Sequence, residues 1–249
     1  IPANCTGLCL QQVSCPTPGD TTTIQGTVYA PNGTDPLPNA LVYVPNARVQ
    51  PFTPGVSCDT CQSLVSGSPL VSAVTGVDGT FTITNAPVGA GIPLVIQLGR
   101  WRRQVTISNV AACGDNQVPA ASTRLPRNKT EGDIPLMAFS TGSVDALECV
   151  MRKIGIQDSE FTTPSNNGRI HIYTGWGDGG ATIGGTGNPV DNQLTGSWSR
   201  LDDYDMVLFP CQANQYTQSG TALTNVRNYL SAGGRVFATH YSYVWFYNN

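Results

Sequence analysis

The stretch from Leu201 to Trp245 reads LDDYDMVLFPCQANQYTQSGTALTNVRNYLSAGGRVFATHYSYVW. Two short apolar runs, residues 206–209 and 235–239, flank a segment in which apolar residues recur at helical spacing. Two parallel strands need a long crossover, and a helix usually supplies it. The stretch therefore predicts a strand–helix–strand unit in an α/β domain with a mostly parallel, flavodoxin-like sheet.

The helix of this unit carries its own start and stop signals. Ser219 or Thr221 can cap its first turn, and Gly233 supplies a left-handed residue after its end. Its apolar stripe is predicted to consist of Leu223, Val226 and Leu230.

Polar residues follow both apolar runs. Open α/β sheets bind ligands beyond the carboxyl ends of their strands, at the point where the strand order reverses. If the strand at 134–139 lies between those at 169–173 and 206–209, that point falls beside the end of the strand at 134–139. We therefore predict a crevice for a small polar molecule, and its candidate binding residues are Thr141, Ser143, Trp176, Cys211, Gln212, His240 and Tyr241.

The composition restricts the class of protein. Only 12% of the residues are charged, and the chain has 27 Gly and 18 Pro among 249 residues, which is typical of a loop-rich extracellular protein. A net charge of -3 argues against nucleic acid as a partner, since binding a phosphate backbone needs a broad basic face. No apolar run approaches the roughly 20 residues of a membrane helix. The chain starts at Ile1, so we expect an upstream signal or lipid-anchor segment to have been removed.

The cysteines are even in number, and most lie in the first half among turn residues. This pattern predicts a disulfide framework in an oxidising compartment. Cys58 and Cys61 form a CxxC pair that would otherwise be half a zinc site or a redox dithiol, but no second CxxC accompanies it. The expected disulfide cysteines are Cys5, Cys9, Cys15, Cys58, Cys61, Cys113, Cys149 and Cys211.

The first half divides into a Cys-rich segment, 1–20, and a region of short alternating strands, 21–123. Regularly spaced short strands with turn residues between them predict a β-sandwich. Asp78-Gly79 is expected to close a tight hairpin between two of them. Residues 124–133 have little apolar pattern and are expected to be a linker to an α/β domain over 134–249.

Three segments of the sandwich region together resemble a known family. GTVYAPNGTDPLPNALVYVP, TGVDGTFTITNAPVG and PLVIQLG are similar to the carboxypeptidase regulatory-like domains, which are small transthyretin-like or Cna-B-like sandwiches. The resemblance covers roughly residues 21–110 and implies a non-catalytic accessory module. The zinc peptidase that sometimes accompanies such domains is not expected, since neither His171 nor His240 has an acidic residue three positions on.

The basic cluster Arg100-Trp101-Arg102-Arg103 lies where a strand edge is expected. We predict a solvated strand face with Trp101 turned inward or packed under an arginine, because charges on an edge discourage unwanted pairing. The alternative is a binding surface for an acidic or carbohydrate partner.

The second domain opens with the strand at 134–139 and a helix expected over 143–154, with a buried stripe of Val144, Leu147, Met151 and Ile154. Cys149 lies off this stripe, which favours a disulfide, and either Cys113 or Cys211 could be its partner. The lone His171 is expected to be packed or solvated rather than a ligand. Residues 174–199 are rich in glycine but lack the Gly-Lys-Ser/Thr of a phosphate loop, so a long surface loop is predicted, with Trp176 and Trp198 as its apolar anchors.

This half of the chain resembles the class I glutamine amidotransferase-like superfamily, particularly its trehalose-utilisation (ThuA-like) branch. The resemblance rests on YDMVL at 204–208 and GGRVFATH at 233–240. It places His240 where the amidotransferases have their nucleophilic cysteine, as in the ThuA-like branch, and Cys211 follows a different strand. Glutamine hydrolysis is therefore not implied.

Two functional hypotheses remain. A secreted or cell-surface protein would use the crevice and loops for binding, adhesion or assembly, with a carbohydrate or another surface protein as partner and no cofactor or metal. This reading needs fewer assumptions, since the sequence reveals no nucleophile–base pair and no metal set. The alternative is a hydrolase or sugar-modifying enzyme of the ThuA-like type, in which His240 acts as general base or ligand.

The end of the sequence adds one expectation. A flavodoxin-like sheet normally continues past its fourth strand, whereas this chain stops soon after an aromatic stretch at 241–247. We expect the α/β domain to be truncated here, so that the natural protein continues or another chain covers these aromatics by self-assembly.

Overall fold

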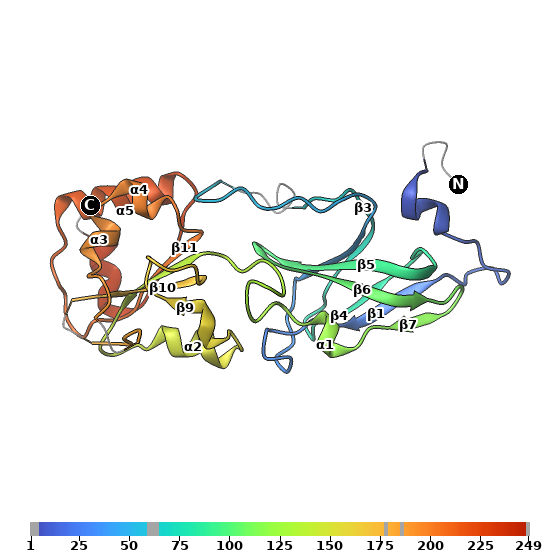
Figure 1. The fold of residues 1–249 in the computed structure, drawn as a ribbon, viewed down its shortest axis with the longest axis horizontal. Coiled ribbons are helices and arrows are strands. Elements are labelled where there is room, and N and C mark those ends of the chain that lie inside the picture. Colours follow the sequence, from blue (N-terminus) through green and yellow to red (C-terminus); the bar gives the residue numbers. More distant parts are fainter. Residues whose placement is uncertain (1–4, 59–64, 177–178, 185–186, 248–249) are drawn as a thin grey trace. The chain divides into compact units, whose positions relative to one another are not determined.

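The computed structural model describes residues 5–58, 65–176, 179–184 and 187–247. The chain forms two compact units (Figure 1), one made of Ile1–Phe52 and Thr60–Asp133 and the other of Thr53–Asp59 and Ile134–Asn249. The second unit thus takes a short segment from the first half of the sequence.

Two antiparallel-rich sheets make up the first unit, and the predicted β-sandwich is confirmed. One sheet has the order β4-β1-β7 and the other the order β3-β2-β5-β6. Their buried faces share one core of β-branched and aliphatic side chains, among them Ile24, Val42 and Ile96. The strands are β1 (Thr23–Thr27), β2 (Leu41–Pro45), β3 (Pro69–Val74), β4 (Thr80–Ile83), β5 (Gly89–Leu98), β6 (Trp101–Val110) and β7 (Asp115–Gln117).

The turn at Asp78-Gly79 does not close a hairpin, contrary to expectation. β3 pairs with β2 and β4 pairs with β1, so the turn carries the chain from one sheet to the other. Asp78 Oδ1 accepts hydrogen bonds from the backbone and hydroxyl of Thr80, which fixes the turn. The Asp-Gly pair forms the expected tight turn, but a local turn does not determine which strands pair.

The arginines near the start of β6 are not a solvated face. Arg100 and Arg102 are buried, and the Arg102 guanidinium lies 3.9 Å from the centre of the Phe52 ring. Arg102 also donates from Nε to Asp133 Oδ2 at 2.8 Å, and the backbones of these two residues pair. The prediction of exposure is wrong because the chain at Asp133 and the ring of Phe52 cover this strand edge.

Two disulfides form among the described cysteines, Cys5–Cys9 and Cys15–Cys113. The first joins Cys5 to Cys9 in the 3-10 helix η1 (Gly7–Gln11), and the second ties the N-terminal segment to the end of the sandwich. Both fit the predicted oxidising environment.

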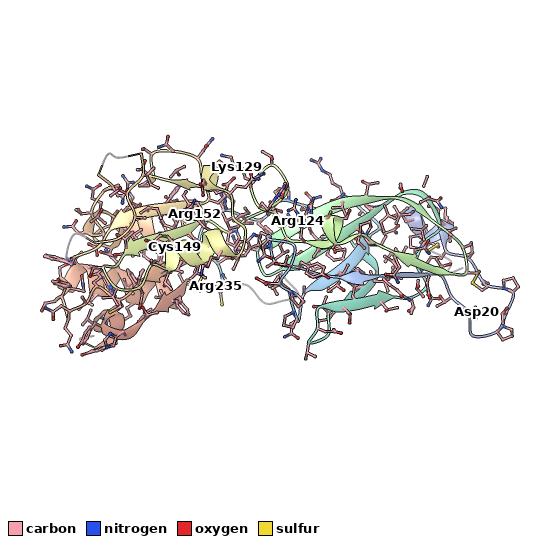
Figure 2. The ribbon with its side chains drawn as sticks, turned by 90° about the horizontal axis from the view of Figure 1, so that it is seen from below. Asp20, Arg124, Lys129, Cys149, Arg152 and Arg235 are labelled. Atoms are coloured by element: carbon pink, nitrogen blue, oxygen red, sulfur yellow. A yellow bond between two sulfur atoms is a disulfide. The ribbon has the colours of Figure 1, made fainter. Side chains whose placement is uncertain are left out.

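The expectation that every cysteine is paired is corrected. Cys58, Cys149 and Cys211 are free thiols, and Cys61 lies outside the described residues. Cys113 is unavailable to Cys149 because it is bonded to Cys15. Cys149 is exposed on its helix, next to Arg152 on the following turn (Figure 2), whereas Cys211 is fully buried.

Residues 124–133, expected to be a linker, fall within the first unit. They follow a short helix, α1 (Ala120–Thr123), and fold around the carboxylate of Glu131, which receives two hydrogen bonds from Arg124 at 2.6 and 2.7 Å. Figure 2 labels Arg124 at this position.

The second unit contains a five-stranded sheet whose paired strands all run parallel, in the order β12-β11-β8-β10-β9. The predicted placement of the first strand of this domain, between the strands at 169–173 and 206–209, is confirmed. The strands are β8 (Met137–Thr141), β9 (Phe161–Thr162), β10 (Ile170–Thr174), β11 (Met206–Phe209) and β12 (Arg235–Ala238).

Helices lie on both sides of this sheet (Figure 1). One face carries Ala138, Tyr173 and Val207, which join a core with side chains of α3, α4 and α5. The helices of this unit are α2 (Leu147–Lys153), η2 (Asp158–Glu160), α3 (Asn192–Thr195), α4 (Trp198–Leu201), α5 (Gly220–Ser231), η3 (His240–Tyr243) and α6 (Val244–Tyr247).

Helix α5 follows most of its sequence signals. The Ser219 hydroxyl accepts from the Ala222 N–H at 3.2 Å, and Gly233 has φ +99 just beyond the helix end, as predicted. The stripe is wrong at one position, since Leu230 is 39% exposed and Tyr229 is fully buried in its place. Tyr229 takes the inward position because its hydroxyl reaches the backbone oxygen of Tyr204 at 2.9 Å.

Helix α2 departs further from expectation. It begins at Leu147 rather than near Ser143, and Val144 is 59% exposed instead of buried. Glu148 is buried, and its Oε1 accepts from the Ala181 N–H at 3.2 Å. A contact with a loop that is distant in the sequence thus helps decide which face of this helix is buried, and no local pattern encodes such a contact.

The aromatic stretch at the end of the chain is partly covered within its own unit. Trp245 is 1% exposed and stacks on Phe209, with ring centres 4.3 Å apart. Tyr243 and Phe246 remain exposed at 40% and 43%.

Candidate functional site

Cys211 and His240 meet at the carboxyl edge of the parallel sheet. Cys211 follows β11 and His240 follows β12, and because these strands are parallel neighbours their ends lie together. Cys211 Sγ lies 3.3 Å from His240 Nδ1. Cys211 is fully buried, whereas His240 is exposed. The sequence pattern predicts both residues at one crevice but does not predict that they touch.

A chain of hydrogen bonds fixes the backbone around this pair. The Cys211 N–H donates to Thr239 Oγ1 at 2.9 Å, and the Thr239 hydroxyl donates to Asp145 Oδ2 at 2.6 Å. The Ser242 hydroxyl donates to the Pro210 carbonyl at 2.8 Å. The loops after β8, β11 and β12 are therefore held together by side-chain hydrogen bonds, to which the half-buried Asp145 and Thr239 and the buried Ser242 contribute.

Gly142 allows the loop after β8 to approach the loop after β11. A Cβ at this position would lie 2.2 Å from the Cys211 carbonyl oxygen, which no side chain could tolerate. The Val144 N–H also donates to that oxygen at 3.3 Å. Any residue other than glycine would separate the two loops at the point where the strand order reverses.

A buried polar network lies behind the carboxyl edge of the parallel sheet and the loops that follow β8, β10, β11 and β12, which together are called the rim. Gln212 donates from Nε2 to Ser140 Oγ at 3.2 Å, and Ser140 donates to Asp191 Oδ2 at 3.0 Å. Burial raises the pKa of Asp191, because its charged form loses hydration that these hydrogen bonds replace only in part. All three side chains are almost inaccessible, so the network shapes the rim from behind and does not reach solvent.

The glycine-rich segment after β10 packs on the loop after β8. The Thr141 hydroxyl donates to the Gly179 carbonyl at 2.9 Å, and a Cβ on Gly179 would lie 2.4 Å from the Ser143 Cβ. Asn188 Nδ2 donates to the Ala181 carbonyl at 2.7 Å. The predicted surface loop is therefore anchored at several of its described residues.

An aromatic pair stands on the same edge of the sheet. Trp176, two residues after β10, stacks on Tyr216, with ring centres 5.9 Å apart and planes 18° from parallel. Trp176 is 50% exposed and Tyr216 is partly buried. The pair presents a partly exposed aromatic surface at the edge of the sheet that also carries Ser143 and His240.

The predicted binding residues separate into two groups by exposure. Those that solvent can reach are Ser143, Trp176, His240 and Tyr241, and those that lie behind them are Thr141, Cys211 and Gln212. The Tyr241 ring packs on the His240 ring with centres 4.0 Å apart.

Sequence reasoning missed four residues that organise the rim: Asp145, Ser140, Asp191 and Thr239. Thr239 was recoverable, since it directly precedes His240 and a hydroxyl at a strand end often binds neighbouring backbone. Asp191 had no signal, because it reaches Ser140 over 51 residues of sequence.

The second histidine is part of the core. His171 Nδ1 lies 2.8 Å from the Tyr204 hydroxyl, and burial lowers the pKa of His171. This agrees with the expectation of a packed histidine rather than a ligand.

Within the described ranges, no three His, Cys, Asp or Glu side chains are grouped closely enough to hold a metal ion. The helices described here are also too short or too polar to cross a membrane.

Comparisons with known proteins leave the family open. No family model and no curated protein matches the chain. Solved structures with remote similarity include a type II cohesin–X-dockerin complex from Acetivibrio cellulolyticus, which is 18% identical with a TM-score of 0.27 over 55% of this chain and 85% of that chain. Catechol 1,2-dioxygenase from Acinetobacter sp. ADP1 is 17% identical with a TM-score of 0.26, over 49% of this chain and 58% of that one. A dioxygenase domain from Streptomyces sp. SirexAA-E is 20% identical with a TM-score of 0.23, over 39% and 61%. Likeness at this level supports no conclusion about function.

Proposed function

We propose that this is a secreted or cell-surface protein that binds a carbohydrate at the rim of its α/β unit without chemical turnover. In this proposal the first unit is a carboxypeptidase regulatory-like accessory sandwich. The second is a catalytically degenerate amidotransferase-like domain of the ThuA-like branch. The disulfides and the low content of charged residues support an extracellular location.

The stacked pair of Trp176 and Tyr216 is the observation that carries the proposal. A sugar ring has an apolar face and a polar periphery, so it packs on an exposed indole while its hydroxyls bind nearby polar groups. Stacking on Tyr216 holds the Trp176 ring in place, so ordering it on binding costs little side-chain entropy. His240 and Ser143 supply exposed polar groups on the same rim.

Binding is tested by titrating the full chain with a panel of neutral and acidic oligosaccharides, cellobiose and maltose among them, followed by calorimetry. Trp176→Ala should weaken binding at least tenfold, because about 1.4 kcal/mol of stacking corresponds to that factor. Trp198→Ala is the matched control, since Trp198 is also exposed but lies on α4. Equal affinities in both variants, or no binding across the panel, would refute the proposal.

A second candidate is a hydrolase or sugar-modifying enzyme. The 3.3 Å contact between Cys211 Sγ and His240 Nδ1 favours it, because a thiol beside an imidazole is a common nucleophile–base arrangement. Hydrolysis of chromogenic esters or glycosides by the wild type, lost in His240→Ala, would establish this candidate over simple binding.

A further inference from the structure

Cys211 and His240 differ sharply in exposure. The sulfur belongs to a fully buried residue, whereas the imidazole in contact with it belongs to an exposed residue. A nucleophile must reach its substrate, and a cysteine without solvent access is typically inert. The contact is therefore better explained by what the thiol does to the imidazole than by chemistry at sulfur.

The histidine ring is held on two sides. Tyr241 packs on its face at 4.0 Å between centres, and Cys211 Sγ contacts its Nδ1 edge. The Cys211 backbone is itself fixed by Thr239 Oγ1 at 2.9 Å and by the close approach of Gly142. His240 also has φ +39, in the left-handed region that a residue with a side chain adopts only at a cost of about 1 kcal/mol. The fold thus keeps this imidazole in one place despite its exposure.

We infer that Cys211 is a positioning residue for His240: its thiol donates to Nδ1, so that the proton of the neutral ring resides on Nε2, and Nε2–H is the group offered to the ligand. A thiol is a weak donor, and the nitrogen that accepts its hydrogen bond carries no proton in the neutral imidazole. Nδ1 faces the buried sulfur, so the opposite edge of the ring is the one that solvent reaches. The ligand group recognised at this point is then an acceptor, such as a sugar hydroxyl or carbonyl oxygen.

Only the choice of ligand rests on the proposed carbohydrate-binding function. The tautomer of the His240 ring can be measured without any ligand. The chain has two histidines, so nitrogen-15 correlation spectra of the imidazoles show two patterns, and His171 serves as the internal reference. The wild-type His240 should give the pattern of a single Nε2–H tautomer near pH 7.5.

Substitutions at Cys211 then separate positioning from packing. Cys211→Ser keeps a donor and should keep the Nε2–H pattern, whereas Cys211→Ala should give averaged tautomers with broadened signals. The His171 pattern should stay unchanged in both variants, which verifies that each is folded. An unchanged His240 pattern in Cys211→Ala, or an Nδ1–H tautomer in the wild type, would overturn the inference.

Binding provides the second measurement. If the carbohydrate panel yields a ligand, Cys211→Ala should weaken it about fivefold, corresponding to one net hydrogen bond, and Cys211→Ser should restore most of the loss. A panel without a ligand would count against the proposed function and leave the tautomer result standing. A tautomer that does not depend on Cys211 would count against the positioning role even if sugars bind.

Discussion

Tyr204 is the residue on which the buried polar cluster of the second unit depends. Its hydroxyl lies 2.8 Å from His171 Nδ1 and 2.9 Å from the Tyr173 hydroxyl, and all three side chains are at least 93% buried. Burial lowers the pKa of His171 and raises those of both tyrosines, so all three groups are neutral over the physiological range. A single hydroxyl therefore satisfies two buried partners.

Tyr204→Phe should lower the free energy of unfolding of the second unit by about 1–3 kcal/mol, because it leaves a buried imidazole nitrogen and a buried hydroxyl without this partner. Tyr216→Phe removes a hydroxyl from a ring held by stacking at the surface and serves as the control. Urea unfolding measures both, and equal losses would contradict the assigned role of Tyr204.

Glu131 plays a comparable part in the first unit. Arg124 binds both of its carboxylate oxygens, and Arg127 adds contacts at 2.9 Å from its side chain and its backbone. The Arg124 hydrogen bonds are the largest cause that holds the pKa of Glu131 far below its ordinary value of 4.5. The unfolded chain therefore takes up the proton first as the pH falls, so the stabilisation is complete well above pH 4.5 and is lost progressively as the pH falls from there toward the lowered pKa of the folded state.

Glu131→Gln should lower the stability of the first unit by about 2 kcal/mol at pH 7. The Glu131 side chain is only 17% exposed, and loss of its negative charge leaves the largely buried Arg124 guanidinium without this counter-ion. The difference from wild type should shrink as the pH approaches 2. Asp158→Asn, in an exposed pair with Arg152, should change nothing measurable. A difference that is independent of pH in thermal melts between pH 7 and pH 2 would argue against this ionic role.

At the scale of single residues, the sequence predicts those candidate site residues that have a recognisable local pattern around them. His240, Cys211 and Trp176 were predictable because they follow apolar runs or stand in a glycine-rich loop. The burial of Arg102 by Phe52 and the link between Ser140 and Asp191 were not, because each joins segments far apart in the chain. Composition identifies such side chains as polar but does not identify their partners.

Among the elements, α5 is the most fully specified by its sequence. The Gly234 N–H donates to the Tyr229 carbonyl at 2.8 Å, and the Gly233 N–H donates to the Leu230 carbonyl at 3.1 Å, which is the pattern of a Schellman motif. The motif turns the chain sharply into β12 and so sets where His240 emerges.

Gly233→Ala should destabilise the second unit by more than about 1 kcal/mol. A side chain at φ +99 is strained, and its Cβ would lie 2.6 Å from the backbone of Cys58. Gly220→Ala, in the first turn of the same helix with open space around it, should be neutral or stabilise the unit by up to about 1 kcal/mol. Denaturant titrations compare the two, and similar effects would contradict the assigned role of the helix end.

The position of β8 between β10 and β11 was predictable by assuming the doubly wound order that is common in parallel sheets. The edge strand β9 was not predicted, because its two residues form no apolar run. The start of α2 was not predictable. Apolar periodicity placed Val144 in the buried stripe, yet the chain between β8 and α2 is fixed instead by contacts with the glycine-rich segment and Cys211. Periodicity describes a helix in isolation, and here distant neighbours decide where it begins.

For the molecule as a whole, the covalent cross-links are unevenly distributed. Cys15–Cys113 spans 98 residues of sequence and encloses nearly the entire sandwich, whereas the described cysteines of the second unit are free. A cross-link of this span restricts the unfolded chain strongly. The two units, each with its own core, should therefore respond differently to loss of the bond.

The double variant Cys15→Ala, Cys113→Ala should lose about 4–5 kcal/mol of stability in the first unit, the value expected for a closed loop of roughly 100 residues. In scanning calorimetry the transition of the sandwich should move down while that of the α/β unit stays in place. Cys149→Ser, at an exposed free thiol, is the control. Equal movement of both transitions would refute separate unfolding.

The second unit is not a continuous piece of the sequence. It includes the segment Thr53–Asp59, in which the Val56 N–H donates to the Asp202 carbonyl at 2.7 Å. A gene fragment that starts at Ile134 would omit this segment and encode an incomplete fold. Recombination that replaces the second unit must therefore exchange two separate stretches of coding sequence. The coding sequence of the sandwich lies between those stretches, so the two units are expected to be inherited together.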